Sequence, residues 1–302
     1  MKLVVALGGN ALLRRSQPPT AANQLANVRI AVSQLARVAV QHEMVLTHGN
    51  GPQVGLLALQ SAAYTAVETY PLDVLDAESE GMLGYLLEQE LANLLPPSSS
   101  VVSVLTRVEV GAADIAFSHP SKPIGPMYTE AQAALASAGR NWVTGADGDG
   151  FRRLVPSPAP IKVLCMPAIG WLLERGALVI VAGGGGIPVM RKADGTGYVG
   201  VEAVIDKDLC SALIATNIQA DCLVIATDVA GIFLNWGQPN QVHIPKATPQ
   251  ELMTHTFASG SMAPKVAAAC AFVVATRRRA VIGDLKEIEA MLAGTAGTQI
   301  TI

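Results

Sequence analysis

The chain alternates short apolar runs with longer stretches in which apolar residues recur at helical spacing. Residues 2–7 and 44–47 are nearly continuous apolar runs, which is typical of strands buried on both faces of a sheet. Residues 20–41, between them, carry apolar side chains on one stripe, and Thr20 is suited to cap the helix that this stripe predicts. Strands and helices in alternation predict a mostly parallel, doubly wound sheet.

The same alternation continues to the end of the sequence. We expect further helices over residues 52–68, 78–94, 165–175, 206–219, 248–255, 261–277 and 284–292. We expect further strands over residues 101–110, 177–182, 221–227, 280–282 and 299–302. The chain shows no repeat of fixed period, and the expected fold class is therefore α/β with an open sheet.

Residues 111–160 interrupt this pattern. They are rich in proline and glycine, and they contain only one short helical pattern, at residues 130–138. We interpret them as an inserted flap or small subdomain that contains a hairpin near residues 141–155. A disordered linker is the alternative, but Trp142 and Phe151 give the segment large apolar side chains to bury.

Composition excludes several classes of protein. Of the 302 residues, 50% are hydrophobic and 15% are charged, which provides a sizeable core and excludes a disordered chain. The net charge of −3 offers no basic surface for nucleic acid or an anionic membrane, and the longest apolar runs are too short to span a bilayer. The cysteines form no C-x-x-C pair, and we expect reduced core residues of a cytoplasmic protein; they are Cys165, Cys210, Cys222 and Cys270.

Three glycine-rich turns directly follow expected strands. They are Gly8-Gly9-Asn10, Gly49-Asn50-Gly51 and the run from Gly183 to Gly186. In an open α/β sheet a ligand lies at the carboxyl ends of the strands, and glycine lets backbone N–H groups approach an anion closely. A helix that begins at such a turn adds the positive end of its dipole. The three turns therefore predict a site for a phosphate or a carboxylate.

The common nucleotide-binding and hydrolase motifs are missing. The sequence has no G-x-x-x-x-G-K-[ST], no G-x-S-x-G and no H-E-x-x-H. It also lacks G-x-G-x-x-G, since after Gly49 and Gly51 the third glycine, Gly55, comes one residue late, so a Rossmann oxidoreductase is a weak alternative. His48 lies beside the second glycine turn, and we expect it to be hydrogen-bonded to its neighbours rather than to contact a substrate.

Three lysines stand in unusual settings. Lys207 lies between two aspartates at the start of an expected helix, where the helix dipole disfavours a cation. Lys265 follows Pro264 in an otherwise helical run, and Lys122 lies in the expected flap. Each alone fits a solvated surface lysine, but as point charges the three suit a transferable phosphoryl group.

Two arginine clusters are less informative. Residues 277–279 are all arginine and end an expected helix, where cations complement the dipole, so we interpret them as a solvated helix end. Arg14 and Arg15 follow the first glycine turn, where one of them could face an anion.

With these turns and lysines, the sequence resembles the carbamate kinases, within the amino-acid kinase fold family. The matching motifs cover the chain from end to end and in order. They are A-L-G-G-N-A-L (6–12), T-H-G-N-G-P-Q-V-G (47–55), Y-P-L-D-V-L (70–75), E-G-M-L-G-Y (80–85), S-K-P-I-G-P (121–126), R-R-L-V-P-S-P (152–158), A-G-G-G-G-I-P-V (182–189), V-E-A-V-I-D-K-D (201–208) and G-S-M-A-P-K-V (260–266). Within that family, the Y-P-L-D and S-K-P-I-G-P segments are specific to the carbamate kinases.

The resemblance implies a three-layer αβα sandwich in three parts, and a homodimer. Residues 1–110 would form an N-terminal lobe for carbamate, residues 111–160 a protruding subdomain, and residues 161–302 a C-terminal lobe for the nucleotide. The implied reaction is reversible phosphoryl transfer, ATP plus carbamate giving ADP plus carbamoyl phosphate, with Mg²⁺ bound through the nucleotide phosphates. In nitrogen catabolism, for example of arginine, the implied direction is toward ATP.

The resemblance also implies a role for each matching residue. The backbone cradle for carbamate and the transferred phosphoryl group would comprise Gly8, Gly9, Asn10, Gly49, Asn50 and Gly51. Lys207 would neutralise the phosphoryl group in flight, Asp208 would orient the lysines, and Lys122 would reach over the substrate from the subdomain. Lys265 would bind the nucleotide phosphates. The remaining nucleotide-binding positions would be Gly183, Gly184, Thr227 and Asp228.

These roles agree with the chemistry of the residues. Phosphoryl transfer needs in-line positioning and stabilisation of charge on the phosphoryl oxygens, which N–H groups and lysines supply. Carbamate already carries a nucleophilic oxygen, so no general base is required. Ala230 and Phe233 stand where relatives often have an acidic residue and a tyrosine, a departure that concerns the adenine pocket.

Two other functions remain open at this point. One is a kinase that phosphorylates another small carboxylate or carbamate, against which the S-K-P-I-G-P motif argues. The other is a non-catalytic nucleotide-binding regulator, which has no need to retain Lys122, Lys207 and Lys265.

Overall fold

The computed structural model describes residues 1–302 apart from 15, 16, 65, 67, 141 and 259. The strands of its main sheet are β1 (Lys2–Leu7), β2 (Glu43–His48), β3 (Val101–Val104), β9 (Leu178–Val181), β12 (Cys222–Thr227), β15 (Lys246–Ala247), β16 (Arg279–Asp284) and β17 (Thr298–Ile300). Their order in space is β15-β17-β16-β12-β1-β2-β9-β3. Each neighbouring pair is parallel except β16 and β17, so the mostly parallel open sheet expected from the sequence is confirmed.

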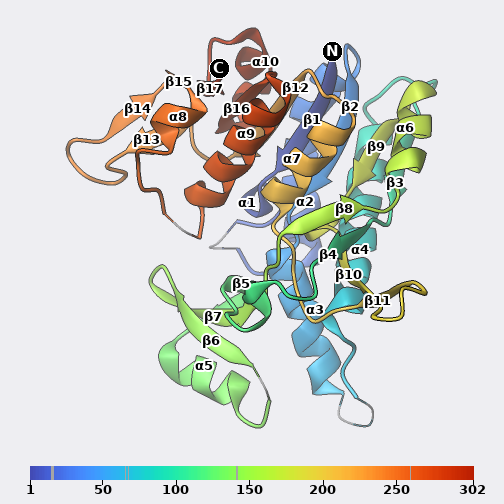
Figure 1. Ribbon diagram of the computed structural model, residues 1–302, viewed down its shortest axis with the longest axis vertical. Coiled ribbons are helices and arrows are strands. Elements are labelled where there is room, and N and C mark those ends of the chain that lie inside the picture. Colours follow the sequence, from blue (N-terminus) through green and yellow to red (C-terminus); the bar gives the residue numbers. More distant parts are fainter. Residues whose placement is uncertain (15–16, 65, 67, 141, 259) are drawn as a thin grey trace.

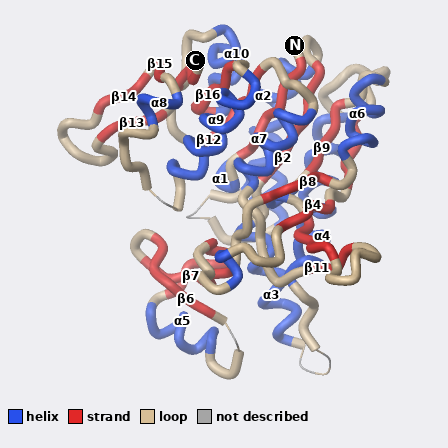
Figure 2. Tube along the Cα trace, in the orientation of Figure 1, coloured by secondary structure: helices blue, strands red, loops and turns tan. Residues whose placement is uncertain are grey.

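Helices cover both faces of the main sheet, which forms the middle layer of an αβα sandwich (Figures 1 and 2). The helices on one face are α6 (Met166–Glu174), α7 (Lys207–Asn217) and α9 (Met262–Thr276). Those on the other face are α2 (Ala21–Ala39), α4 (Leu72–Ala92) and α10 (Ile288–Ala293). Along β1, Val4 packs in the core on the face covered by α6, α7 and α9, while Leu3 and Val5 pack in the core on the opposite face. Successive side chains of a strand point to opposite faces of the sheet.

Most of the expected elements are present, with shifted ends. Thr20 caps α2, since its hydroxyl accepts a hydrogen bond from the N–H of Asn23 at 3.2 Å. The helix expected from residue 78 begins earlier, at Leu72. The helix expected over residues 52–68 is α3 (Gly51–Ala63), and residues 65 and 67 of that range lie outside the described residues.

The strand expected over residues 101–110 is instead two strands in two sheets. β3 ends at Val104, and β4 (Arg107–Val110) joins a second sheet of order β11-β10-β4-β8. The chain bends at Thr106, whose hydroxyl donates to the carbonyl oxygen of Val104 at 2.7 Å and holds the turn. The other strands of this sheet are β8 (Pro160–Val163), β10 (Ile187–Arg191) and β11 (Tyr198–Gly200).

Several short elements complete the fold. They are α1 (Gly9–Leu12), α8 (Pro249–Leu252), the hairpin strands β13 (Ile232–Leu234) and β14 (Val242–Ile244), and 3₁₀ turns at Ile115–Phe117, Gly183–Gly185 and Leu285–Glu287. In the part of the chain that the structure describes, no helix is both long enough and apolar enough to cross a membrane. The cysteines are free thiols, as expected, and Cys210, Cys222 and Cys270 are buried.

A small antiparallel sheet and one helix project from the main body as a subdomain (Figure 1). The sheet has the order β5-β7-β6, and its elements are β5 (Lys122–Tyr128), β6 (Val143–Asp147), β7 (Gly150–Val155) and the helix α5 (Glu130–Ser137). The hairpin expected near residues 141–155 is therefore present as β6 and β7, and residue 141 of that range lies outside the described residues. Thr129 and Gln132 form a capping box that starts α5.

The subdomain sits on α3 by direct contact between two backbones. A Cβ atom added to Gly55 of α3 would lie 2.0 Å from the Cα of Gly125 of β5, so the contact requires glycine. Ile124 and Val155 of the subdomain also share a small core with Val54.

The main sheet crosses the boundaries that the sequence suggested for the lobes. β9, which belongs to residues 161–302, lies between β2 and β3, which belong to residues 1–110. The division into two lobes and a subdomain thus stays a prediction, and the sheet itself is continuous.

Candidate active site

The glycine turns meet at one edge of the main sheet. β12, β1, β2 and β9 are consecutive neighbours in that sheet, and all four run in parallel. β12 ends at Thr227, next to Asp228. β1, β2 and β9 lead into the first, second and third glycine turns, respectively. A cavity of about 520 Å³ opens there, which we name the first cavity. The predicted residues of its wall are Gly8, Gly9, Gly49, Asn50, Gly51, Lys122, Gly184, Lys207, Asp208, Thr227, Asp228 and Lys265.

Some backbone N–H groups of the turns already donate hydrogen bonds to other backbone groups of the protein. Gly8 donates to the carbonyl oxygen of Ala226 at 2.9 Å, and Gly49 donates to that of Leu7 at 3.2 Å. In the first two turns, the N–H groups that can face a ligand therefore belong to later residues; in the third turn, Gly185 and Gly186 donate to the carbonyl oxygens of Ala182 and Gly183. Gly51 opens α3, whose positive N-terminus lies at the cavity wall. Asn10 lies in α1, and its side chain is outside the described part of the structure.

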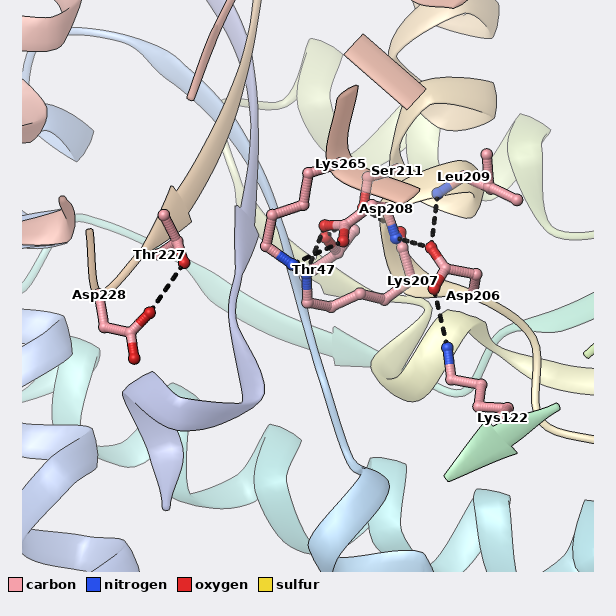
Figure 3. A network of polar contacts seen from close by, with 10 residues as sticks. All are labelled: Thr47, Lys122, Asp206, Lys207, Asp208, Leu209, Ser211, Thr227, Asp228 and Lys265. Carbon is pink, nitrogen blue, oxygen red and sulfur yellow. Dashed lines mark hydrogen bonds and ion pairs between the residues drawn. The ribbon is translucent and has the colours of Figure 1, made fainter. Parts of the chain in front are cut away.

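Three lysines from distant parts of the chain converge on the first cavity (Figure 3). Lys207 Nζ donates to one carboxylate oxygen of Asp208, and Lys265 Nζ donates to the other at 3.1 Å. Lys122 Nζ, from β5 of the subdomain, pairs with Asp206 Oδ2 at 2.9 Å. The structure thus brings together the four residues for which the sequence suggested a catalytic role.

Asp206 explains why a helix can begin with a lysine. Its Oδ1 accepts hydrogen bonds from the N–H groups of Asp208 and Leu209, at 2.9 and 3.2 Å, and caps α7. Burial would raise the pKa of Asp206, but Lys122, Lys207 and these hydrogen bonds outweigh burial and hold the pKa below its usual range. The negative charge at the cap offsets the unfavourable position of the Lys207 cation.

Burial also acts on Lys207 itself. It lowers the pKa of the Lys207 ammonium, Asp208 opposes this change, and the neighbouring Lys265 adds to it. A cation that is partly desolvated interacts more strongly with a nearby anion than one in water does. Lys207 is therefore suited to stabilise negative charge inside the first cavity.

A second cavity of about 950 Å³ adjoins the first. Arg14, Thr227, Asp228 and Lys265 line both cavities, and Arg15 lies outside the described residues. The second cavity also has aromatic and apolar walls, formed by Phe233, Trp236, Phe257 and Met262. A polar wall shared by the two cavities and an apolar remainder suit a ligand with a charged end and a flat apolar end.

Gly183, a predicted nucleotide contact, and His48, expected to bond to its neighbours, line neither cavity. Gly183 is buried behind the first cavity, so its contact with a nucleotide stays a prediction. His48 is fully buried, and its Nδ1 lies 3.3 Å from the carbonyl oxygen of Gly49, which confirms the expected bond to a neighbour. Burial lowers the pKa of His48 to about 4, so its ring is neutral at pH 7.

The arginine run at the end of α9 is tied to its surroundings. Arg277 adopts a left-handed conformation at the helix end, and Arg278 pairs with Asp221 at 2.9 Å. Arg279 donates to the carbonyl oxygen of Leu292 at 2.6 Å. The expected solvated helix end therefore holds for Arg278, which is exposed, and less well for Arg279.

The chain is similar to known kinases over nearly its whole length. The model of the amino acid kinase family matches residues 1–284. A carbamate kinase from Haemophilus influenzae is 54% identical over 100% of this chain and 97% of its own length. The chain belongs to the carbamate kinases of the amino acid kinase family.

Further relatives agree with this assignment. A carbamate kinase from Escherichia coli strain K12 is 50% identical over 99% of both chains. The solved structure of the carbamate kinase from Giardia lamblia bound to AMP-PNP is 37% identical, with a TM-score of 0.88 over 99% of this chain and 98% of that one. The protein is therefore a phosphotransferase with carbamate kinase activity, and the alternatives of another acceptor or a non-catalytic regulator are not favoured.

Sequence reasoning missed one charged pair of the carbamate kinase site. Arg152 and Asp147, on the two strands of the subdomain hairpin, line the first cavity and pair at 3.2 Å. Arg152 Nε also donates to the carbonyl oxygen of Gly125 at 2.9 Å. The motif R-R-L-V-P-S-P contains Arg152, but only the pairing of β6 with β7 shows which of its two arginines faces the cavity: Arg153 stacks on Trp142 instead.

Proposed function

We propose that phosphoryl transfer takes place in the first cavity, between carbamate held at the glycine turns and a nucleotide held in the second cavity. The observation that carries this proposal is the meeting of Lys122, Lys207 and Lys265 at one cavity wall. Lys265 lines both cavities, as a residue that follows a phosphate chain from one cavity into the other would do.

The transfer itself requires only charge and position. A carbamate oxygen attacks the γ-phosphorus of ATP, the bond from that phosphorus to the bridging oxygen breaks, and its electron pair stays on ADP. Negative charge spreads over the transferred phosphoryl oxygens, which Lys207 and the N–H groups of the turns stabilise. Asp208 fixes Lys207 and Lys265 by binding one of them with each oxygen.

Asn50 takes part through its backbone. Its side-chain amide donates to Asp76 Oδ1 at 2.9 Å and to Ser79 Oγ at 2.8 Å, so both hydrogens are used inside the protein. The proposed cradle therefore uses the backbone of Asn50 with that of Gly9, Asn10 and Gly51. Gly8 and Gly49, whose N–H groups bond to Ala226 and Leu7, would shape the cavity wall.

The second cavity is the proposed place for the nucleotide base and ribose. Its shared wall would leave Thr227 and Asp228 at the phosphate end, and Phe233 among the apolar residues. The Giardia lamblia relative was solved bound to AMP-PNP, which supports a nucleotide site in this chain. Gly184, which lines the first cavity, would then face the phosphates rather than the base.

Mg²⁺ is proposed to arrive with the nucleotide. Asp147, Asp206 and Asp208, which line the first cavity, are each ion-paired with a lysine or an arginine. Among the described residues, no group of three or more His, Cys, Asp or Glu side chains is placed to hold a metal. This donor set fits an ion held mostly by phosphate oxygens and water, which would offset the charge of the nucleotide.

Assembly, compartment and pathway complete the proposal. A homodimer is implied by the resemblance and supported by exposed apolar side chains, Tyr85 and Leu105, near the end strand β3 of the main sheet. Light scattering should then give about twice the chain mass of 31.4 kDa, and the chain mass itself would contradict a dimer. The four free thiols support a reducing, cytoplasmic compartment. Nitrogen catabolism, for example of arginine, would run the reaction toward ATP.

The experiment is ATP formation by the purified chain from ADP, Mg²⁺ and carbamoyl phosphate, with acetyl phosphate as the control donor. We expect ATP from carbamoyl phosphate alone. ATP from acetyl phosphate alone would assign another acceptor. ATP from neither donor, with ADP still binding, would favour a regulator.

A further inference from the structure

One turn of α4 buries three polar side chains against the glycine turns. Asp76, Ser79 and Glu80 are 1%, 0% and 2% exposed. Their spacing of three and four residues places them on one face of the helix. Burying a carboxylate is unfavourable unless it gains specific partners, so this face needs an explanation in what it contacts.

Asp76 and Ser79 hold the second glycine turn. The amide nitrogen of Asn50 donates to both of them, and the Ser79 hydroxyl in turn donates to the carbonyl oxygen of Asp76 at 2.9 Å. Ser79 can therefore only accept from Asn50, which fixes the orientation of the Asn50 amide.

Glu80 holds the third glycine turn. Its Oε1 accepts from the N–H of Gly183 at 3.0 Å, and its Oε2 accepts from the N–H of Thr106 at 3.1 Å. The Thr106 hydroxyl accepts in turn from the N–H of Ala182 at 2.9 Å. Glu80 thus binds Gly183 directly and Ala182 through Thr106.

The second and third turns also pack directly on each other. A Cβ atom added to Gly183 would lie 2.4 Å from the His48 ring, and one added to Gly184 would lie 2.1 Å from the Asn50 side chain. A shift of either turn must therefore move the other.

We propose that this turn of α4 is a positioning unit, in which Asp76, Ser79 and Glu80 fix the second and third glycine turns relative to each other for phosphoryl transfer. Asn50 and Gly184 line the first cavity, whereas the three residues of α4 lie behind it and act through them. The inference rests on the proposed function of the turns. It adds residues to that function that contact neither substrate.

The charge state of Glu80 gives the unit a measurable signature. Burial raises the pKa of Glu80 to about 7, although its hydrogen bonds from Thr106 and Gly183 act in the opposite direction. The ionised carboxylate accepts two N–H bonds, but a protonated one carries a hydrogen that opposes one of these donors. The kcat should therefore rise as the pH increases through about 7 and Glu80 ionises.

Other titratable groups face Glu80, and substitution of Glu80 alone distinguishes its titration from theirs. They are Asp76 on the same helix, His48 on β2, Cys165 before α6 and Cys210 on α7. Burial raises the pKa of Asp76 well above its usual range, lowers that of His48 to about 4 and raises those of the two thiols.

Glu80→Gln tests the proposal in the full-length protein. Glutamine keeps one acceptor and replaces the other with a donor, so one of the two N–H bonds is lost. We expect kcat to fall about 10-fold or more, since small misplacements of reacting groups carry such losses. The KM for ADP should change little, and the pH limb near about 7 should disappear.

Glu88→Gln is the matched control. Glu88 lies two turns further along α4, and its Oε2 accepts from the N–H of Ser103 at 2.9 Å, away from the glycine turns. This variant should keep wild-type kcat and the same pH limb, even where its stability is lower. Equal loss of kcat in both variants would assign Glu80 a general structural role and overturn the proposal.

A second variant covers the case in which Glu80→Gln does not fold. Ser79→Ala removes one acceptor of the Asn50 amide and adds no charge, and kcat should fall by roughly several-fold at unchanged KM for ADP. Wild-type kcat in a folded Glu80→Gln or Ser79→Ala protein would overturn the positioning unit. Absence of ATP formation by the wild-type protein would instead overturn the proposed function.

Discussion

Two regions of the molecule supply the cations of the first cavity, and they hold them differently. The main body supplies Lys207 and Lys265 on a shared Asp208, with side chains of Lys207 and Asp208 only 9% and 3% exposed. The subdomain supplies Lys122, whose side chain is 20% exposed and pairs with Asp206. A folded main body is therefore enough to place two lysines, whereas the third also depends on how the subdomain sits on α3.

The largest expected effect comes from the main body. Lys207→Ala removes a buried cation, and kcat for ATP formation should fall on the order of 10²–10³-fold, as when one electrostatic stabiliser is lost. Lys246→Ala removes an exposed lysine on β15 and should leave kcat unchanged. A folded Lys207→Ala protein with wild-type turnover would contradict the role of this lysine.

The subdomain should affect binding of one substrate more than the other. Lys122→Ala removes a charge-assisted contact worth about 1.5–3 kcal/mol, so affinity for carbamoyl phosphate should weaken roughly 10–100-fold. Affinity for ADP, measured by calorimetry, should change far less. Lys162→Ala, at an exposed lysine of β8, is the control. Equal weakening for both substrates would place Lys122 outside the acceptor side of the cavity.

The contact between the subdomain and α3 can be disturbed without substituting a lysine. Gly55→Ala forces a methyl group into the backbone of β5, and we expect a loss of about 1–3 kcal/mol in the free energy of unfolding. The KM for carbamoyl phosphate should rise with it, because Lys122 moves with β5. Gly170→Ala, in α6, meets no atom within 4 Å and should be neutral or slightly stabilising. An unchanged KM in Gly55→Ala would show that the position of Lys122 does not depend on the contact between Gly55 and Gly125.

The smallest expected effect is on stability against pH. The pKa of Glu80 is about 7 in the folded protein, above its ordinary value of 4.5. The folded state therefore binds more protons than the unfolded state between these values, and the contribution of Glu80 to stability falls as pH rises across that window. Urea unfolding should show a shallower fall for Glu80→Gln than for wild type. Parallel curves would assign the titration to another group.

The sequence predicted the main sheet and the edge that carries the site. Uninterrupted apolar runs are sufficient for β1, β2, β9 and β12, because such strands are buried on both faces. The glycines after them marked the turns, and the odd settings of Lys122, Lys207 and Lys265 marked the cations. The resemblance supplied the reaction, since spacing alone did not distinguish an acceptor.

Other parts could not be read from local pattern. β10, β11, β13 and β14 are strands too short to show a recognisable alternation, and β10 also pairs with β4 from the first half of the chain. Asp76 lies before the expected start of its helix, and a polar residue there predicts a solvated face. It is buried because Asn50, 26 residues earlier, provides its partner, which only the folded chain brings near.

The contact between Gly55 and Gly125 has a consequence for evolution and for protein engineering. Two peptide backbones meet there without side chains, so this part of the contact depends on shape, while Ile124 and Val155 add an apolar contact with Val54 beside it. We therefore expect α5, which lines neither cavity, to tolerate replacement as long as this contact is kept. A redesign toward another acceptor would change the hairpin residues that line the first cavity and keep the pair of glycines.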